Sequence, residues 1–169
     1  MKLYLEQIPN VARDVLRQLI AAGEVEVENL HEAQLDVEAI LKEHVRQDRE
    51  ITDRAKQILE KRSLGYDQFS KIRRTLAEER GLGDEEELLG HLISQIYEIL
   101  MRSPHVAEVY VEEGLFRRRL QKILQEHGKI DDTLDQEVRQ RIKNLQEGTA
   151  SWEIEYKKVM DQVKRKHNL

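Results

Sequence analysis

Two histidine–aspartate pairs are the residues whose types and spacing come nearest to chemistry in this chain. His44 precedes Asp48 by four residues, and His127 precedes Asp131 by the same interval. Residues four apart share one face of an α-helix, and imidazole with carboxylate suits zinc, iron or manganese. If the two helices that carry these pairs cross, the four side chains define a candidate metal site.

The same pairs also have a purely structural interpretation. A polar pair on a helix seam can fix the register of packed helices, or it can lie where the helices splay into water. The dimetal bundle enzymes space Glu and His by three residues and need more carboxylates than this chain offers. We therefore expect no bound cofactor and keep a metal-binding bundle as a third hypothesis.

The elements that must position these pairs are two long amphipathic helices. The first is expected from about residue 31 to 62, and the second follows 83 residues later. Heptad spacing keeps one stripe of each helix against a partner, so the two helices are expected to pack antiparallel. The seam positions of the first are Val37, Leu41, His44, Asp48, Ile51, Ala55, Ile58 and Arg62, and those of the second are Leu120, Leu124, His127, Asp131, Leu134, Val138, Arg141 and Leu145.

The correspondence extends beyond the seams, at an offset of 83 for a glycine and of 84 for an alternating segment, and predicts an internal duplication. Gly65 corresponds to Gly148, and an alternating Glu-Val-Glu-Val-Glu segment at 24–28 recurs in related form at 108–112. Strict alternation is strand spacing, so the two segments are expected to pair as a small ribbon. The predicted fold is mainly α, a pseudo-twofold, internally duplicated helical bundle. It forms a single domain, 1–169, made of two similar halves, 1–83 and 84–169.

Composition excludes several classes of function. Charged residues make up 36% and apolar residues 39% of 169 positions, with a net charge of -5 and no cysteine. Without cysteine there are no disulfides, no thiolate catalysis and no cysteine-ligated zinc site. The negative charge argues against a dedicated nucleic-acid-binding protein. No apolar run has membrane length and no signal-peptide pattern is present, so a cytoplasmic protein is expected.

Basic clusters give the second functional hypothesis, an RNA- or ribosome-associated protein. Most basic residues alternate with Asp and Glu, which is typical of solvated faces, but the last helix is locally basic. Aromatic residues do not interleave with the basic runs, as a base-stacking platform would require. The candidate nucleic-acid-binding residues are Arg73, Arg74, Lys157, Lys158, Lys164, Arg165 and Lys166.

Conventional catalysis finds no support in the sequence. Gly81-Leu82-Gly83 reads as a helix stop, and no serine stands in a nucleophile-elbow pattern. Long amphipathic helices without a reaction centre favour a non-enzymatic scaffold or adaptor for protein–protein interaction. Its partner is an unidentified protein, and a homodimer is one form that we expect.

Several short stretches in fixed order resemble a known family. They include Tyr66-Asp67-Gln68-Phe69, Ser103-Pro104-His105-Val106 and Trp152-Glu153-Ile154-Glu155-Tyr156. Together they cover essentially the whole chain and resemble a bacterial family of uncharacterised proteins, the domain-of-unknown-function family numbered 507. The resemblance implies a single cytosolic family domain, and it supplies no activity, cofactor or catalytic residue.

Overall fold

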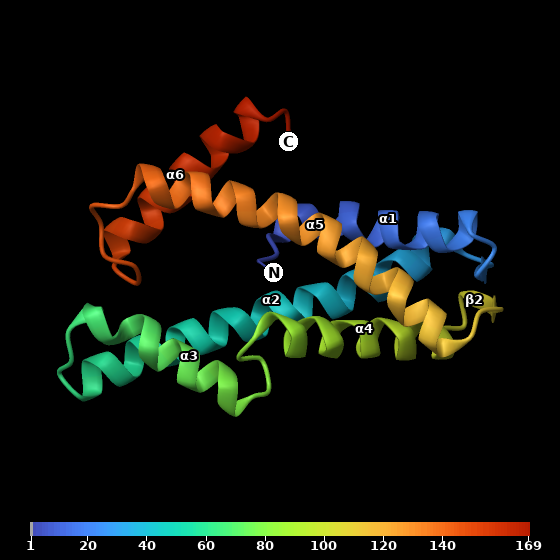
Figure 1. Cartoon of the computed structure of the whole chain (residues 1–169), viewed down its shortest axis with the longest axis horizontal. Helices are drawn as coiled ribbons and strands as arrows, with labels where there is room; N and C mark the ends of the chain where they lie inside the picture. The colour runs from blue at the N-terminus through green and yellow to red at the C-terminus, as the bar shows by residue number, and fades with distance from the viewer. Residues whose placement is uncertain (1) are drawn as a thin grey trace. The chain divides into compact units, whose positions relative to one another are not determined.

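The computed structural model describes residues 2–169 and is mainly α-helical with one two-stranded sheet (Figure 1). The expected mainly α class is therefore confirmed. The order helix, strand, long helix, helix occurs twice, whereas a duplication of the sequence stays a prediction. In chain order the elements are η1 (Leu5–Gln7), α1 (Ile8–Ala21), β1 (Val25–Val27), α2 (Leu30–Lys61), η2 (Tyr66–Gln68), α3 (Phe69–Glu79), α4 (Glu85–Arg102), β2 (Val106–Val109), α5 (Glu113–Arg141) and α6 (Ala150–Lys166).

The described residues form two compact units, and each unit takes residues from both halves of the sequence. Unit 1 contains the described residues up to Gln47 together with Glu85–Gly128. Unit 2 contains Asp48–Asp84 together with Lys129–Leu169. The long helices α2 and α5 each contribute their first part to unit 1 and their last part to unit 2.

Unit 1 is built around one apolar core from α1, α2, α4 and α5. Pro9 lies in the first turn of α1, where its missing N–H costs no hydrogen bond. Tyr97 and Phe116 meet edge to face, with ring centroids 5.2 Å apart. The buried side chains of this core are Leu3, Ile8, Val11, Ala12, Val15, Leu16, Leu19, Val25, Ala33, Val37, Leu41, Leu89, Leu92, Ile93, Ile96, Leu100, Phe116, Leu120, Ile123 and Leu124.

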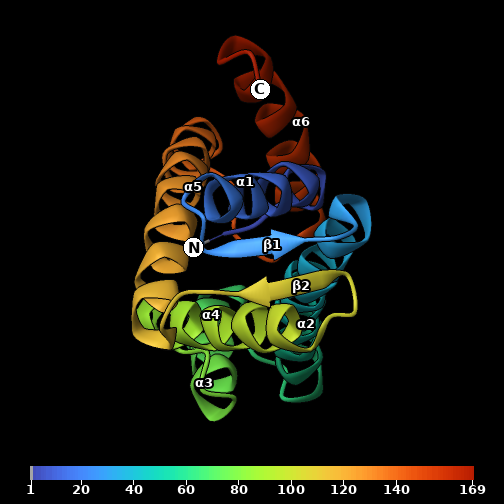
Figure 2. The same cartoon turned by 90° about the vertical axis from the view of Figure 1, so that its right-hand side faces the viewer.

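The expected pairing of the two valine-containing segments is confirmed in unit 1. β1 and β2 are antiparallel, with Val25 opposite Val109, and an irregularity in the register follows Glu26 (Figure 2). β2 ends at Val109, so most of the expected segment 108–112 lies outside the strand. Since β1 leads into α2 and β2 into α5, both helices leave the ribbon in the same direction within unit 1 (Figures 1 and 2). The expected antiparallel packing of the seam helices is therefore wrong.

Unit 2 has smaller apolar clusters. Where α2 meets α3, Ala55, Leu59 and Phe69 are buried together, with Ile72 and Leu76 packed against them. The end of α5 and α6 bury a second set, Leu134, Val138, Ile142, Tyr156, Val159, Met160 and Val163.

Burial follows the predicted seam in unit 1 and drifts from it in unit 2. Val37 and Leu41 are fully buried, whereas Arg62 and Arg141 at the far ends of the seams are exposed. Their neighbours Leu59 and Ile142 are buried instead. A straight α-helix rotates by about 20° per heptad away from a 3.5-residue repeat, so the inward face moves along a long helix.

Candidate functional site

His127, in the second histidine–aspartate pair, contacts a residue distant in sequence. His127 Nε2 lies 3.0 Å from Asp14 Oδ2 on α1, and Asp14 also accepts hydrogen bonds from Arg17 and Gln18. Burial raises the pKa of Asp14, but the hydrogen bonds from Arg17, His127 and Gln18 outweigh it and hold that pKa below its ordinary value. His127 therefore joins α5 to α1 within unit 1, while Asp131 is buried in unit 2.

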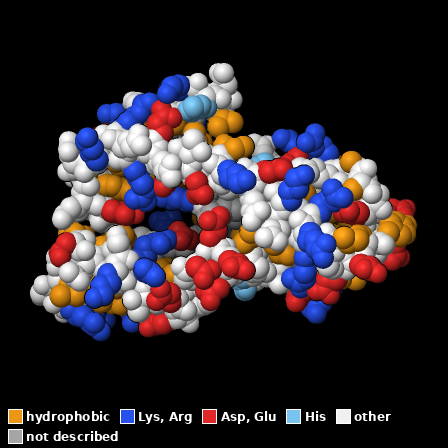
Figure 3. Space-filling model, in the orientation of Figure 1, with side chains coloured by type: hydrophobic (Ala, Val, Ile, Leu, Met, Phe, Trp, Pro, Cys, Tyr) orange, Lys and Arg blue, Asp and Glu red, His pale blue; other side chains and the backbone are white. Residues whose placement is uncertain are grey.

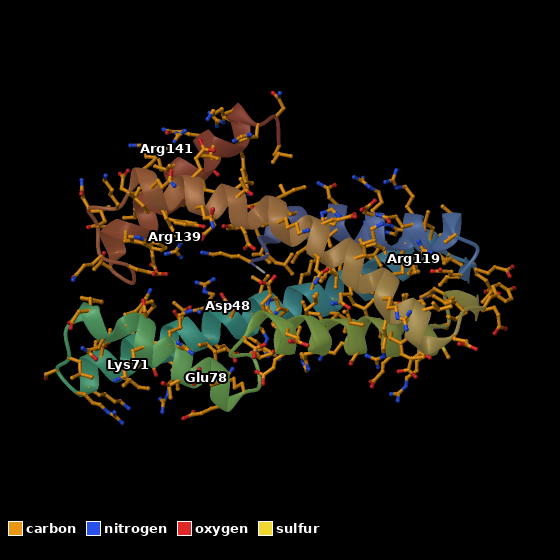
Figure 4. All side chains as sticks on the ribbon, viewed as in Figure 1. Asp48, Lys71, Glu78, Arg119, Arg139 and Arg141 are labelled. Atoms are coloured by element: carbon orange, nitrogen blue, oxygen red, sulfur yellow. The ribbon has the colours of Figure 1, made fainter. Side chains whose placement is uncertain are left out.

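Asp48, in the first pair, is engaged by a residue distant in sequence. Its carboxylate accepts from Arg73 Nη2 on α3, and Arg73 Nε donates to Thr52 Oγ1 at 3.1 Å. Thr52 Oγ1 in turn donates to the Asp48 carbonyl oxygen at 3.1 Å. These bonds join α2 to α3 in unit 2, where Asp48 is labelled in Figure 4. His44 is buried in unit 1.

The candidate metal site stays a prediction. Within residues 2–169, no three His, Asp or Glu side chains are grouped so that they could hold a metal ion. The contacts of His127 and Asp48 described above give both residues a structural role.

Of the candidate nucleic-acid-binding residues, three have acidic partners, Lys164 is half-buried with an interaction of its own, and three are exposed cations. Arg73 is engaged by Asp48, Arg74 Nε lies 2.9 Å from Glu78 Oε1, and Lys166 Nζ lies 3.0 Å from Glu137 Oε1. Such pairs reduce the charge that a phosphate would meet. The available cations are exposed on α6. Lys157 and Arg165 have no ion pair with another described residue, and Lys158 lies 3.9 Å from Glu155.

The available cations share one face of α6, which we call the α6 outer face. Its residues follow the three- and four-residue spacing of a helical stripe and line a groove of about 450 Å³. Lysine and arginine side chains gather over α6 in Figure 3. Ile154 is 68% exposed, the largest value among the exposed large apolar residues described. The lining residues are Ile154, Lys157, Lys158, Asp161, Gln162 and Arg165.

The local sequence explains why α6 presents this face. Thr149 caps the helix, its Oγ1 accepting from the Trp152 N–H at 3.2 Å. Apolar residues at the opposite positions, Tyr156, Val159, Met160 and Val163, are buried. The outer face is therefore what remains once the apolar stripe is packed.

A polar and aromatic network fixes the start of α6 to α5. Trp152 stacks on Tyr156 with centroids 4.8 Å apart, and the Arg139 guanidinium lies 5.3 Å from the centre of the Trp152 ring. Tyr156 donates to Asp135, and Arg139 donates to both Asp135 and Glu147. Burial lowers the pKa of Arg139, but these two carboxylates raise it above its ordinary value. The rings of Trp152 and Tyr156 are thus committed to structure.

Glu137 binds the far end of α6. It lies 2.9 Å from His167 Nε2, 3.0 Å from Lys166 Nζ and 2.7 Å from Arg141 Nη2. These hydrogen bonds, that of His167 first, lower the pKa of Glu137 to about 2. Figure 4 places Arg141 and Arg139 on opposite sides of α5. Each end of α6 is therefore held by a different side of the same helix.

Sequence reasoning missed a second groove, which lies between α4 and α5 in unit 1. This α4–α5 groove measures about 530 Å³. Gly90 helps to form it, since a Cβ at this position would meet nothing within 4 Å. A glycine inside the most apolar helical stripe of the chain was the available signal. The lining residues are Glu85, Glu86, Leu89, Gly90, Ile93, Gln121 and Gln125.

The charge of the α4–α5 groove is opposite to that of the α6 outer face. Two glutamates and no lysine or arginine line it, and acidic side chains gather over the start of α4 in Figure 3. Leu89 and Ile93, each 5% exposed, form an apolar floor.

None of the described helices is both long enough and apolar enough to cross a membrane.

Comparison with known proteins places the chain in a family without assigning an activity. No curated protein matches it. A family model described as "Protein of unknown function (DUF507)" matches residues 1–169, which is the whole sequence. The resemblance seen in the short sequence stretches is therefore confirmed, and the chain belongs to the DUF507 family.

Proposed function

We propose that this protein is a non-enzymatic helical scaffold or adaptor whose α6 outer face binds another protein chain. The single observation that carries the proposal is the groove on this face, which is lined by three cations and by an isoleucine that is 68% exposed. An exposed apolar side chain beside exposed cations offers a partner chain both an apolar contact and a complementary charge. The partner segment that fits is acidic with an apolar anchor.

The alternative, RNA or ribosome binding through α6, explains less of this surface. Arg73, Arg74 and Lys166 already have acidic partners, and Lys164 is half-buried with an interaction of its own, which leaves Lys157, Lys158 and Arg165 as the main contacts for phosphate. Three phosphate contacts give only a shallow dependence of affinity on salt. Phosphate contact also leaves the exposed Ile154 without a role, and Trp152 and Tyr156 are packed rather than offered to bases.

A site-specific crosslinking experiment separates the two functions. A photo-crosslinking amino acid is placed at Gln162 in the groove, and at exposed Gln57 on α2 as a matched control. The adaptor predicts a discrete protein adduct at Gln162 only, which resists nuclease and is lost in a Lys157→Glu, Arg165→Glu variant. RNA adducts that nuclease removes, or equal adducts at both positions, would overturn the proposal.

A further inference from the structure

We infer that the acidic partner of the α6 outer face is the α4–α5 groove of a second copy of this chain. The inference rests on the proposed function, because it names the occupant of the same α6 surface. Its basis is that one chain carries two grooves of opposite charge, each with apolar side chains in its lining. Complementary charge between two surfaces steers association and fixes register.

The two surfaces are opposite in net charge, since three cations and one aspartate line the first and two glutamates line the second. Lys157, Lys158 and Arg165 on α6 correspond to Glu85 and Glu86 at the mouth of the α4–α5 groove. A cation contacting a carboxylate forms a charge-assisted hydrogen bond, which is stronger than a neutral one.

The apolar and amide groups match as well. Ile154 is the exposed apolar side chain of one surface, and Leu89 and Ile93 form the floor of the other. The space over Gly90 leaves room for an incoming side chain. Beyond the charges, Asp161 and Gln162 can exchange hydrogen bonds with the side-chain amides of the opposite groove, which belong to Gln121 and Gln125.

The lengths of the two surfaces are also compatible. At 1.5 Å per residue, the α6 stripe from Ile154 to Arg165 spans roughly 16 Å, and the α4 wall from Glu85 to Ile93 spans roughly 12 Å. Each copy offers one surface of each kind, so the contact joins the α6 outer face of one copy to the α4–α5 groove of another. Such a contact is heterologous, because different patches of the two copies meet.

A reciprocal charge swap tests the inference with the full-length chain. Variant A carries Lys157→Glu and Arg165→Glu, so its α6 face and its groove are both acidic. Variant B carries Glu85→Lys and Glu86→Lys, so both of its surfaces are basic. All four positions are exposed, so both variants are expected to fold, and circular dichroism checks this.

Analytical ultracentrifugation of each variant and of their mixture gives the readout. Like charges across an interface are strongly unfavourable, so self-association of A or B alone should weaken by about tenfold or more relative to the unaltered chain. Mixing A with B pairs acidic surfaces with basic ones, and should restore association between A and B. A monomeric unaltered chain, undiminished association of A or B, or a mixture that stays monomeric would overturn the inference.

A substitution that changes no charge gives an independent check. Gly90→Leu fills the α4–α5 groove and should weaken association by about tenfold, the effect of losing roughly 1.4 kcal/mol. Gly114→Leu is the matched control, because a Cβ at exposed Gly114 also meets nothing within 4 Å and lies outside the groove. Equal effects of the two leucines would contradict the assigned groove.

The outcomes distinguish this inference from the proposed function. If the chain is monomeric and the Gln162 probe captures a different protein, the inference of self-association is wrong and the proposed function stands. A Gln162 probe that captures only RNA overturns both. A Gln162 adduct with the mass of two chains, lost in Gly90→Leu, supports both.

Discussion

Unit 1 and unit 2 share two helices yet are stabilised in different ways. In unit 1, α1, α2, α4 and α5 enclose one apolar core that includes fully buried Leu16, Leu92 and Leu120. In unit 2 the apolar clusters are smaller and ion pairs such as Asp48–Arg73 and Lys56–Glu153 join the helices, whereas in unit 1 the Asp14–His127 contact supplements a larger core. Burial of apolar area is insensitive to charge screening, whereas exposed ion pairs weaken with salt. A heptad pattern therefore predicts which face of a helix is packed, but it does not predict whether apolar burial or ion pairs stabilise that packing.

The largest effect expected is the loss of a core side chain in unit 1. Leu120 is fully buried, so Leu120→Ala should lower the free energy of unfolding by about 2–5 kcal/mol through lost burial and the cavity left behind. Urea denaturation followed by circular dichroism measures this. Leu115 on the same helix is 52% exposed, and Leu115→Ala should change stability by less than about 0.5 kcal/mol. Similar losses of unfolding free energy in both variants would contradict the conclusion that the apolar core stabilises unit 1.

The next effect concerns the joint between α5 and α6 in unit 2. Gly148 has φ of 90°, and a Cβ there would lie 3.1 Å from the Phe69 ring. Gly148→Ala should therefore destabilise unit 2 by about 1–3 kcal/mol, from backbone strain and displacement of the ring. Hydrogen exchange should quicken in α3 and α6 more than in α1.

Gly90→Ala is the matched control for that substitution. Gly90 is helical and has open space where a Cβ would lie, so the alanine should stabilise the chain by about 0.5–1 kcal/mol. The two substitutions should therefore change the free energy of unfolding in opposite directions. The same sign for both would contradict the geometry described at Gly148.

A smaller effect is expected for the ion-pair network of unit 2. Arg139→Met removes the bonds to Asp135 and Glu147 and the contact with the Trp152 ring, and should cost about 1–2 kcal/mol. Part of this difference should vanish in 1 M salt, where the Debye length is about 3 Å. Arg17→Met in unit 1 removes an exposed pair with Asp14, and should cost less than about 1 kcal/mol. Unfolding midpoints at low and high salt provide the measurement.

The smallest effect is a pH dependence at the end of α6. The native pKa of Glu137 is about 2, below the ordinary 4.5, because His167 and Lys166 donate to it. A lowered native pKa means that the unfolded chain binds the proton first, so this stabilisation is complete above about pH 4.5 and is lost as the pH falls towards 2. Glu137→Gln should therefore flatten the acid side of the stability–pH curve. An unchanged slope between those pH values would argue against the α5–α6 contact.

The periodic features of the fold could be predicted from sequence, because they depend on neighbouring residues. The three- and four-residue spacing around Leu41 and Leu124 placed the buried faces of both long helices, and alternation around Val25 placed one strand. The far seam positions were displaced, with Leu59 buried in place of Arg62, because helical rotation accumulates over many residues.

The polar contacts could not be predicted, because they depend on which helices the fold brings together. Asp48 binds Arg73, 25 residues away, although His44 lies only four residues from it in sequence. His127 binds Asp14, 113 residues away, although Asp131 lies only four residues from it in sequence. Likewise, the α4–α5 groove exists only once two separate segments pack beside Gly90.

The discontinuity of both units has a consequence for synthesis of the chain on the ribosome. Unit 1 ends its first segment at Gln47 but needs residues up to Gly128, which are made about 80 residues later, roughly 4–16 s at 5–20 residues per second. Until then the apolar faces of α1 and the first part of α2 have no partner helices to cover them. The nascent chain is therefore expected to depend on protection from aggregation for most of its translation, and to fold late and almost as a whole.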